Sequence, residues 1–342
     1  MPENDRQRAG ASSGEEALIA EFFAPLSEGF PGAYGLKDDC AAIAVSPGQE
    51  LIVTTDAVIA GVHFLPGDEP GAIAWKALAV NVSDLVAKGA VPLAYVMNLA
   101  LPDIDRSWLA AFSGGLLSAQ TAFGCRLIGG DTDRTPGPLS VSITAFGTVP
   151  SGCMVQRTTA RDGDIVYVSG TIGDAALGLA LRHDPQLADR SGLDAEACTY
   201  LENRLSRPRP PLALGPALRA CASSAMDVSD GLMKDFDRLC RASRVGGRLQ
   251  ASLIPLSPPA RKVISTDETD LADLMSGGED YEVLATISPA KAAQFEELAH
   301  GAGIPVTRIG EVTAGPAGAV AIDPAGGTMS FGKLGWDHFL AR

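Results

Sequence analysis

Long apolar segments are absent from this sequence. Hydrophobic runs are interrupted repeatedly by Asp, Lys, Gly or Pro, and none approaches the ~20 residues that span a bilayer. The first residues, from Met1 to Arg8, are polar and lack the apolar core of a secretory signal. We therefore expect a cytoplasmic protein that does not bind membranes.

Cysteine and histidine are scarce. The chain has six cysteines and four histidines, and no two cysteines have the Cys-x-x-Cys spacing. Cysteines so widely separated indicate neither a disulfide framework nor a zinc site, and they fit a reducing compartment. The few histidines leave little scope for histidine-based metal or triad chemistry.

Several nucleotide-binding motifs are also missing. The sequence contains no Gly-x-x-x-x-Gly-Lys-Ser/Thr loop, no His-Arg-Asp signature and no Gly-x-Gly-x-x-Gly fingerprint. These absences argue against the P-loop, protein-kinase and dinucleotide-binding folds as the source of any nucleotide site.

Positive charge is in short supply. The chain carries 41 acidic against 27 basic residues, a net charge of −14. Binding to a nucleic-acid backbone needs a basic face, so we expect no nucleic-acid partner. If the acids cluster, an anionic substrate can approach them only through metal ions.

The length and the residue patterns predict an α/β protein with two domains. The 342 residues suffice for two hydrophobic cores. Predicted helices and strands alternate, as in layered α/β folds. The helices are expected over 71–88, 105–123, 174–182, 231–243 and 289–302, and the strands over 51–55, 93–101, 139–149, 164–169 and 281–287. A further strand over 41–45 is expected to pair with 51–55. Pro150-Ser151-Gly152 is the candidate boundary between domains 1–150 and 151–342.

Acidic residues recur at the ends of predicted elements or beside glycine. The first, Asp56, follows Thr54 and Thr55 at the end of a short apolar strand, where α/β folds tend to bind ligands. Carboxylate and hydroxyl oxygens suit Mg²⁺ rather than zinc. The other acidic spots are Asp38-Asp39, Asp84, Asp131-Thr132-Asp133, Asp227 with Asp230, and Glu279-Asp280.

Each spot also has an ordinary structural explanation. Asp38-Asp39 fits a solvated turn, Asp84 an ion pair with Lys88, Asp131 a turn after two glycines, and Asp230 a helix N-cap. Together they favour metal binding, because Asp84 lies in an otherwise apolar helix where an unpaired carboxylate would be costly. Several Mg²⁺ ions around a polyphosphate would satisfy such a diffuse set of acids.

Six motifs occur in a characteristic order. They are Gly-Leu-Lys-Asp-Asp-Cys-Ala, Thr-Thr-Asp-x-x-x-x-Gly-Val-His-Phe, Ala-Val-Asn-Val-Ser-Asp-Leu, Gly-Gly-Asp-Thr, Asp-Val-Ser-Asp-Gly-Leu and Ser-Gly-Gly-Glu-Asp-Tyr-Glu. With this ordered set, the sequence resembles the thiamine-monophosphate kinase family of the aminoimidazole-ribonucleotide-synthetase-like superfamily. The resemblance extends from about Glu15 to a further motif, Gly-Trp-Asp-His-Phe, which ends at Phe339, and so covers nearly the whole chain.

The resemblance implies a fold, a reaction and an assembly. It implies direct in-line transfer of the γ-phosphoryl group of ATP, the co-substrate, to thiamine monophosphate, assisted by several Mg²⁺ ions. It implies a two-domain synthetase-like fold whose N-terminal domain forms a barrel-like homodimer core. The C-terminal domain is then expected to cover the nucleotide cleft.

The resemblance also assigns roles to residues. The implied Mg²⁺ ligands are Asp39, Thr54, Thr55, Asp56, Asp84, Asp131, Asp227 and Asp230, of which Asp56, Asp84 and Asp131 are expected to be catalytic. The implied nucleotide contacts are Gly130, Asp131, Arg157 and Ser229. The implied thiamine-phosphate contacts are His63, Glu279 and Trp336, whose indole ring offers a π face to a cationic thiazolium.

Two positions depart from the family pattern, and two rival functions stay open. Lys37 stands where a glycine is usual, and Lys88 where a methionine is usual; neither change removes an implied ligand. One rival is another enzyme of the superfamily, an ATP-dependent cyclo-ligase or a selenophosphate synthetase. The other is a regulatory protein that binds nucleotide or metal without catalysis.

Overall fold

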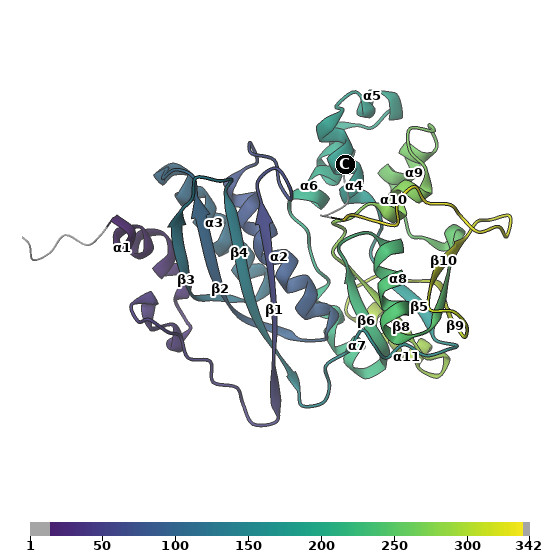
Figure 1. Cartoon of the computed structure of the whole chain (residues 1–342), viewed down its shortest axis with the longest axis horizontal. Helices are drawn as coiled ribbons and strands as arrows, with labels where there is room; N and C mark the ends of the chain where they lie inside the picture. Colours follow the sequence, from purple (N-terminus) through teal and green to yellow (C-terminus); the bar gives the residue numbers. More distant parts are fainter. Residues whose placement is uncertain (1–13, 338–342) are drawn as a thin grey trace, which may run out of the picture. The chain divides into compact units, whose positions relative to one another are not determined.

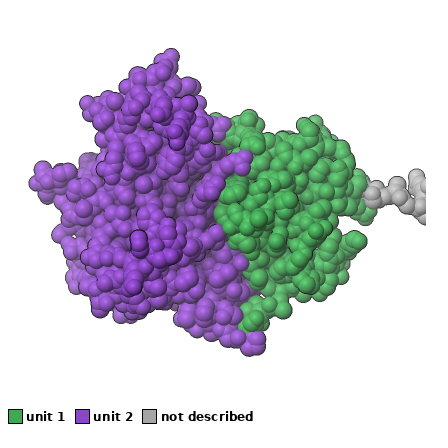
Figure 2. Space-filling view, turned by 180° about the vertical axis from the view of Figure 1, so that it is seen from behind, with its two compact units in different colours: residues 1–46, 55–78, 93–145 green, residues 47–54, 79–92, 146–342 purple. Residues whose placement is uncertain are grey.

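A computed structural model describes residues 14–337 of the chain. By its internal contacts the chain divides into two compact units (Figure 2). The first unit comprises residues 1–46, 55–78 and 93–145, and the second comprises 47–54, 79–92 and 146–342. The motif residues His338 and Phe339 lie outside the described range. The expected boundary at Pro150 stays a prediction.

A four-stranded sheet carries the first group of elements (Figure 1). Its strand order is β1-β4-β2-β3, so the sheet is open, and β2 pairs in parallel with β3. The strands are β1 (Gln49–Ile59), β2 (Val91–Leu101), β3 (Arg126–Arg134) and β4 (Ser140–Pro150). Two long helices, α2 (Pro70–Ala87) and α3 (Arg106–Phe123), accompany them, preceded by α1 (Gly14–Leu18) and short π and 3₁₀ turns over residues 19–36.

Local signals in the sequence explain where α3 begins and ends. Asp105 accepts hydrogen bonds from the backbone amides of Ser107 and Trp108, which would otherwise lack partners, and Gly124 ends the helix in the left-handed conformation. The helix packs closely on α2, because Gly115 faces Gly71 and leaves no room for a side chain between the backbones.

A buried amide, Gln120, joins α3 to the sheet. Its Oε1 accepts hydrogen bonds from the Tyr95 hydroxyl on β2 (3.0 Å) and the Leu127 amide on β3 (2.8 Å). Its Nε2 donates to the carbonyl of Leu26 (3.2 Å). Because every partner is buried or backbone, losing this amide would leave several polar groups unsatisfied. Gln120 therefore holds β2 and β3 in register beneath the helix.

A six-stranded sheet carries the second group of elements. Its order is β10-β7-β9-β5-β8-β6; β10 and β7 are parallel and the other pairs are antiparallel. The strands are β5 (Ile165–Ser169), β6 (Ala222–Val228), β7 (Gly246–Gln250), β8 (Glu282–Ile287), β9 (Val306–Thr313) and β10 (Gly318–Ile322). The helices are α4 (Asp174–His183), α5 (Leu187–Ser191), α6 (Ala195–Ser206), α7 (Gly215–Cys221), α8 (Leu232–Ser243), α9 (Pro258–Ile264), α10 (Leu271–Ser276) and α11 (Ala292–Gly301).

Two hydrophobic cores stabilise this second unit. One lies between the sheet and α8, whose Leu232, Phe236 and Leu239 are fully buried. The other is a small helical core in which Leu177 and Leu181 of α4 meet Leu201 of α6. The apolar face of α8 repeats at helical spacing, so its burial follows from the sequence pattern.

The predicted α/β class with two groups of elements is confirmed, but two local predictions were wrong. Residues 41–46 form no strand, and β1 has β4 as its neighbour instead. The eleven-residue β4 alternates buried and half-buried positions, whereas none of residues 41–46 is buried, so burial does not hold that segment on the sheet. The strand β3 was not anticipated, because its two glycines and two aspartates are typical of a turn.

No helix in the described part of the chain is long and apolar enough to cross a membrane.

Candidate active site

Asp84 and Asp227 are neighbouring carboxylates within the second unit. Asp84 lies on α2 and accepts a hydrogen bond from the Thr54 hydroxyl of β1 (2.5 Å). Asp227, near the end of β6, accepts one from the Ser83 hydroxyl (2.9 Å) and is only 5% exposed. Ser83 and Asp84 are consecutive on α2, so one turn of helix brings the predicted ligands Thr54, Asp84 and Asp227 together.

Carboxylates of like charge lie close together in this group. Burial, followed by the nearby charges of Asp84 and Asp235, raises the pKa of Asp227 well above its usual value. Burial and, to a lesser degree, Arg157 lower the pKa of Lys88 to about 8, although Asp227 and Asp84 oppose the shift. The Lys88 amine donates to the carbonyl of Ala225 (2.7 Å). Lys88 is thus a buried cation that partly offsets the two carboxylates, and the group would gain from another cation.

The turn after β6 is shaped by backbone amides. The amides of Ser229 and Asp230 both donate to Oδ2 of Asp235 (3.0 and 2.9 Å), whose pKa burial raises to about 6. The Asp230 carboxylate pairs with Arg238 (2.5 Å) and lies 3.4 Å from the Lys234 amine. Helix α8 is capped by Gly231 rather than by a side chain, so the N-cap explanation for Asp230 was wrong.

Two further motif residues join this turn. The amide of Glu279 donates to the carbonyl of Ser229 (2.7 Å), and the amide of Trp336 donates to the carbonyl of Asp230 (2.8 Å). The Lys234 amine also donates to the Trp336 carbonyl, and the Lys333 amine lies 5.8 Å from the centre of the indole ring. Residues from three distant motifs therefore lie side by side.

Glu279 stands in a strained turn. Both Glu279 and Tyr281 have positive φ angles, +73° and +51°. For residues with a Cβ such conformations cost of order 1–3 kcal/mol each, and they concentrate at functional sites. The turn therefore depends on the contacts around it.

Arg157 is positioned by its backbone. Its carbonyl accepts hydrogen bonds from the hydroxyls of Ser224 and Ser243, both at 2.9 Å. The residue is exposed, so its guanidinium can meet a ligand as a two-pronged donor.

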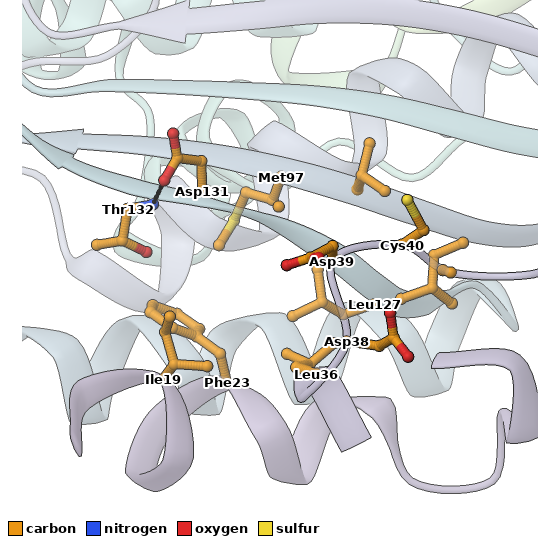
Figure 3. A pocket seen from close by; sticks show the side chains of 15 residues that line it. Ile19, Phe23, Leu36, Asp38, Asp39, Cys40, Met97, Leu127, Asp131 and Thr132 are labelled. Carbon is orange, nitrogen blue, oxygen red and sulfur yellow. Dashed lines mark hydrogen bonds between the residues drawn. The ribbon is translucent and has the colours of Figure 1, made fainter. Parts of the chain in front are cut away.

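The first unit has a cavity of about 190 Å³ lined in part by acids (Figure 3). Asp38, Asp39 and Asp131 line it together with the backbone of Gly129 and Gly130. Apolar side chains of the short N-terminal turns and of the sheet complete it: Ile19, Phe23, Leu36, Val96, Met97, Leu127 and Ile128. Asp131 pairs with Asn98 along β3, so the turn explanation for Asp131 was wrong.

The remaining predicted residues of this unit lie on or just after β1. The Thr55 hydroxyl donates to the carbonyl of Ile143 (3.1 Å), and Asp56 is exposed one residue further along. Nδ1 of His63 accepts a hydrogen bond from the amide of Ile59 (3.1 Å), which leaves Nε2 as the protonated nitrogen of a neutral ring. The Lys76 amine holds the His63 carbonyl (2.7 Å).

Comparisons with known proteins identify the family of this chain. The family described as "AIR synthase related protein, N-terminal domain" matches residues 37–149, and the corresponding C-terminal domain matches 161–323. The thiamine-monophosphate kinase of Escherichia coli K12 is 40% identical over 328 residues, covering 95% of this chain and 98% of that protein. The chain belongs to the thiamine-monophosphate kinase family.

Solved structures of the family share the fold. The thiamine-monophosphate kinase of Stenotrophomonas maltophilia K279a is 38% identical with a TM-score of 0.76, over 83% of this chain and 89% of that one. A structure described as "AaThiL complexed with AMPPCP and TMP" is 30% identical with a TM-score of 0.74, over 86% of this chain and 89% of that one. Membership of this family favours the kinases over the cyclo-ligase and selenophosphate synthetase considered above.

Two residues that shape this candidate site were not predicted from the sequence. Asp235 organises the Ser229–Asp230 turn, and its signal was a carboxylate on the apolar face of α8. Arg204 reaches the Glu279 turn from α6, donating to the carbonyl of Asp280 (3.3 Å). No sequence signal marked Arg204, because its partners lie far away along the chain.

Gly130 provides a test of the close packing of β3 against β2 beside the cavity. Its φ is +151°, and a Cβ there would lie 1.9 Å from the carbonyl oxygen of Met97, whereas a Cβ on Gly129 would meet only Val96 at 3.6 Å. We expect Gly130→Ala to destabilise the protein by about 1–3 kcal/mol, because β2 and β3 must separate.

Gly129→Ala is the matched control and should stay within about 0.5 kcal/mol of the parent. Chemical denaturation monitored by circular dichroism measures both. Equal stability of the two variants would contradict the close approach of β3 to β2 at Gly130.

Proposed function

We propose that this chain transfers the γ-phosphoryl group of ATP to thiamine monophosphate, producing thiamine diphosphate and ADP. The observation that carries the proposal is the 40% identity with a thiamine-monophosphate kinase over 95% of the chain. It is supported by the clustering of Ser229, Asp230, Glu279 and Trp336 around one turn.

The acceptor shapes the mechanism. A phosphate oxygen of thiamine monophosphate is already ionised at neutral pH, so the reaction needs no strong general base. The difficulty is the approach of two anions, and positioning with charge neutralisation is the main task of enzymes that transfer phosphoryl groups. Direct in-line transfer then requires no phosphorylated enzyme.

Mg²⁺ suits the donor atoms of this chain. Thr54, Asp84 and Asp227 present hard oxygens. Burial and the charge of Asp84 raise the pKa of Asp227, and a bound cation would offset this unfavourable negative charge. Among residues 14–337 no three His, Cys, Asp or Glu side chains are preassembled as a metal centre. We therefore infer Mg²⁺ sites in which phosphate oxygens of the substrates supply the remaining ligands. When bound, Mg²⁺ would neutralise charge on the two phosphates.

The proposed ligands comprise two sets. The second unit contributes Thr54, Asp84, Asp227 and Asp230; the first contributes Asp39, Thr55, Asp56 and Asp131. Asp56, Asp84 and Asp131 are the residues to which we assign the largest catalytic effect, because each is a carboxylate proposed to hold Mg²⁺.

The nucleotide and thiamine contacts follow from the surfaces described above. The cavity beside Gly130 and Asp131 combines apolar walls with an acidic rim, which fits a flat base attached to metal-bound phosphates. Arg157 and Ser229 are the further proposed nucleotide contacts. For thiamine phosphate we propose Glu279 as hydrogen-bond acceptor, the Trp336 ring as a stacking surface and His63 as a polar contact.

A homodimer is part of this proposal. Strand β1 forms one edge of its sheet, pairing with β4 alone among residues 14–337, and carries exposed Leu51 and Val53. An exposed strand edge with apolar side chains is unfavourable for an isolated protein, and a second copy could cover it. A cytoplasmic location, where ATP is abundant, completes the proposal.

The reaction is tested with purified protein, Mg-ATP and thiamine monophosphate, separating the products by chromatography. We expect thiamine diphosphate to form one-for-one with ADP. Asp131→Asn or Asp56→Asn should lower kcat at least ~100-fold without unfolding the protein, since charge stabilisation of the transition state is lost.

Asp133→Asn is the control, because Asp133 is exposed two residues further along β3 and belongs to no proposed set. Near-parental turnover in Asp131→Asn and Asp56→Asn would remove the metal-ligand assignment. Nucleotide binding without any product would favour the regulatory alternative.

Cysteine labelling tests the nucleotide cavity. Cys40 lines the cavity and Cys153 is exposed elsewhere, whereas burial raises the pKa of Cys125 and of Cys240 to about 12. At pH 8 an alkylating reagent should modify Cys40 and Cys153 in the native protein and the two buried thiols only after unfolding.

Mg-ATP should slow the labelling of Cys40 at least about threefold at saturation, while Cys153 serves as the internal control. Mass spectrometry of the labelled peptides measures both sites. Identical rates at Cys40 with and without nucleotide would place the nucleotide outside this cavity.

The dimer is tested by sedimentation. A dimer has twice the 35.3 kDa mass of one chain. Val53→Glu, at a position 55% exposed on β1, should shift the equilibrium towards monomer because it introduces charge into the proposed interface.

Val320→Glu is the matched control, at a position 41% exposed on the edge strand β10 of the other sheet. It should leave the dimer intact. A monomeric parent protein, or equal behaviour of the two variants, would contradict an interface along β1.

A further inference from the structure

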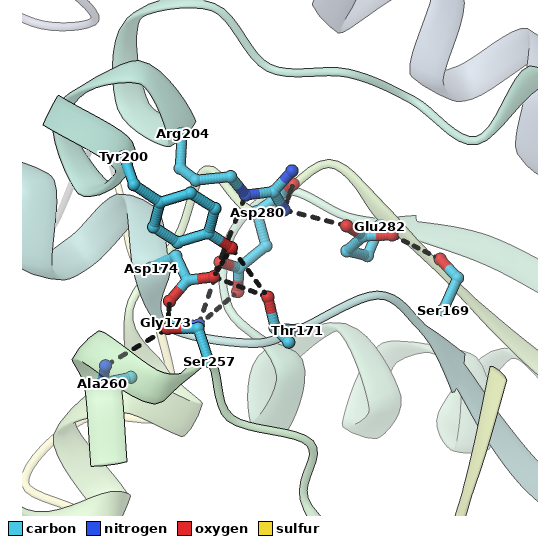
Figure 4. Close-up of polar contacts among 10 residues, drawn as sticks. All are labelled: Ser169, Thr171, Gly173, Asp174, Tyr200, Arg204, Ser257, Ala260, Asp280 and Glu282. Carbon is cyan, nitrogen blue, oxygen red and sulfur yellow. Dashed lines mark hydrogen bonds and ion pairs between the residues drawn. The ribbon is translucent and has the colours of Figure 1, made fainter. Parts of the chain in front are cut away.

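A network of buried charges has no part in the chemistry proposed above. It consists of Asp174, Arg204, Asp280 and Glu282, hereafter the Arg204 network (Figure 4). The three acidic residues are 0%, 1% and 6% exposed, respectively. They belong to segments far apart in sequence: the first turn of α4, the turn that carries Glu279, and the start of β8. Arg204 comes from α6.

Arg204 touches all three segments. Its Nη2 donates to Oε1 of Glu282 (2.8 Å) and to the backbone carbonyl of Asp280 (3.3 Å). Its Nε lies 4.0 Å from Oδ2 of Asp174. A planar guanidinium can direct several donors at fixed angles, which an ammonium group cannot do.

The acids are themselves tied to backbone and hydroxyl donors. Asp280 accepts from the amide of Gly173 at the start of α4 (3.0 Å), and Glu282 accepts from the hydroxyl of Ser169 on β5 (2.5 Å). Asp174 accepts from the hydroxyls of Thr171 (2.5 Å), Tyr200 (2.8 Å) and Ser257 (2.5 Å). The residues on both sides of Tyr281 are therefore anchored to neighbouring elements.

The turn over residues 279–281, which these contacts anchor, cannot be expected to keep its shape unaided. Glu279 and Tyr281 both adopt left-handed backbone angles, with Asp280 between them. Their amides form backbone hydrogen bonds to the end of β6, at Ser229 (2.7 Å) and Val228 (2.8 Å). Because residues with a Cβ disfavour this conformation, the surrounding contacts must over-determine it.

We propose that Arg204 is a positioning residue for Glu279: by holding the Asp280 carbonyl and the Glu282 carboxylate, it keeps the strained turn in the form that presents Glu279 to thiamine monophosphate. This inference deepens the proposed function and rests on it for the identity of the substrate. Arg204 itself acts through the turn and need not touch the substrate.

The charge balance of the network supports this role. Burial raises the pKa of Asp280 well above its usual value and raises that of Glu282, while Arg204 opposes both shifts. Removing Arg204 would leave three buried acids with no guanidinium beside them. The acids would then take up protons or rearrange, and the strained turn contains one of them, Asp280, and is followed directly by another, Glu282.

Hydrogen exchange tests the hold on the turn independently of turnover. In Arg204→Met we expect the peptide covering residues 277–283 to exchange at least tenfold faster than in the parent protein. Arg190→Met is the matched control, because Arg190, which lies on α5, also binds two acids of the second unit, Asp184 (2.8 Å) and Glu268 (2.9 Å). That control should leave the peptide unchanged.

Kinetics test whether the turn acts through Glu279. Arg204→Met should raise KM for thiamine monophosphate at least tenfold, with KM for ATP within twofold and kcat within threefold of the parent. A change that weakens the binding of substrate and transition state equally raises KM and leaves kcat nearly unchanged. In a Glu279→Ala background the same change should have no further effect on KM, because the two residues serve one contact.

The possible outcomes separate the two proposals. Unchanged exchange in residues 277–283, acceleration spread equally over the second unit, or additive effects of the Arg204 and Glu279 changes on KM would each overturn the positioning role. If Arg204→Met does not fold, Arg204→Lys is used, and it should show the same effects at reduced size. If the parent protein makes no thiamine diphosphate, the proposed function fails, and the exchange experiment alone decides whether Arg204 holds the turn.

Discussion

Negative charge held out of water is the constraint on which the rest of this structure depends. Burial, followed by the nearby charge of Asp84, disfavours the ionised form of Asp227. Lys88 offsets part of this charge and has its own pKa lowered by burial. Such a balance suits a site that receives cations with its substrate, because arriving positive charge relieves repulsion that folding has already built in.

Backbone groups, more than side chains, arrange the acids around this constraint. Asp235 gathers the amides of Ser229 and Asp230, and the carbonyls of the same two residues receive the amides of Glu279 and Trp336. The turn after β6 is therefore a junction of three sequence motifs. Strain at Glu279 and Tyr281 is tolerated there because the Arg204 network and the end of β6 hold the turn from several directions.

Local patterns of residues predict many of these elements correctly. Helix α3 follows from its apolar spacing between Asp105 and Phe123, and α8 from its periodic Leu232, Phe236 and Leu239. The strand β3 does not follow from its local sequence, because Gly129, Gly130 and Asp131 have poor strand propensity on their own. Pairing with β2 overrides that propensity. The expected strand at 41–45 failed for the converse reason, since none of its residues is buried and its alternating pattern alone does not hold it against the sheet.

The sequence by itself determined the α/β class, the family and the identities of the acidic motifs, because these depend on residue type, order and local periodicity. Only the tertiary structure decided which acids meet. It brought Asp227 to Ser83 and Asp84, set Asp131 on a strand beside a cavity, and placed Arg204 against Asp280 and Glu282. These contacts join residues that are far apart along the chain, and their energies depend on burial and mutual distance. Neither quantity exists until the chain has folded.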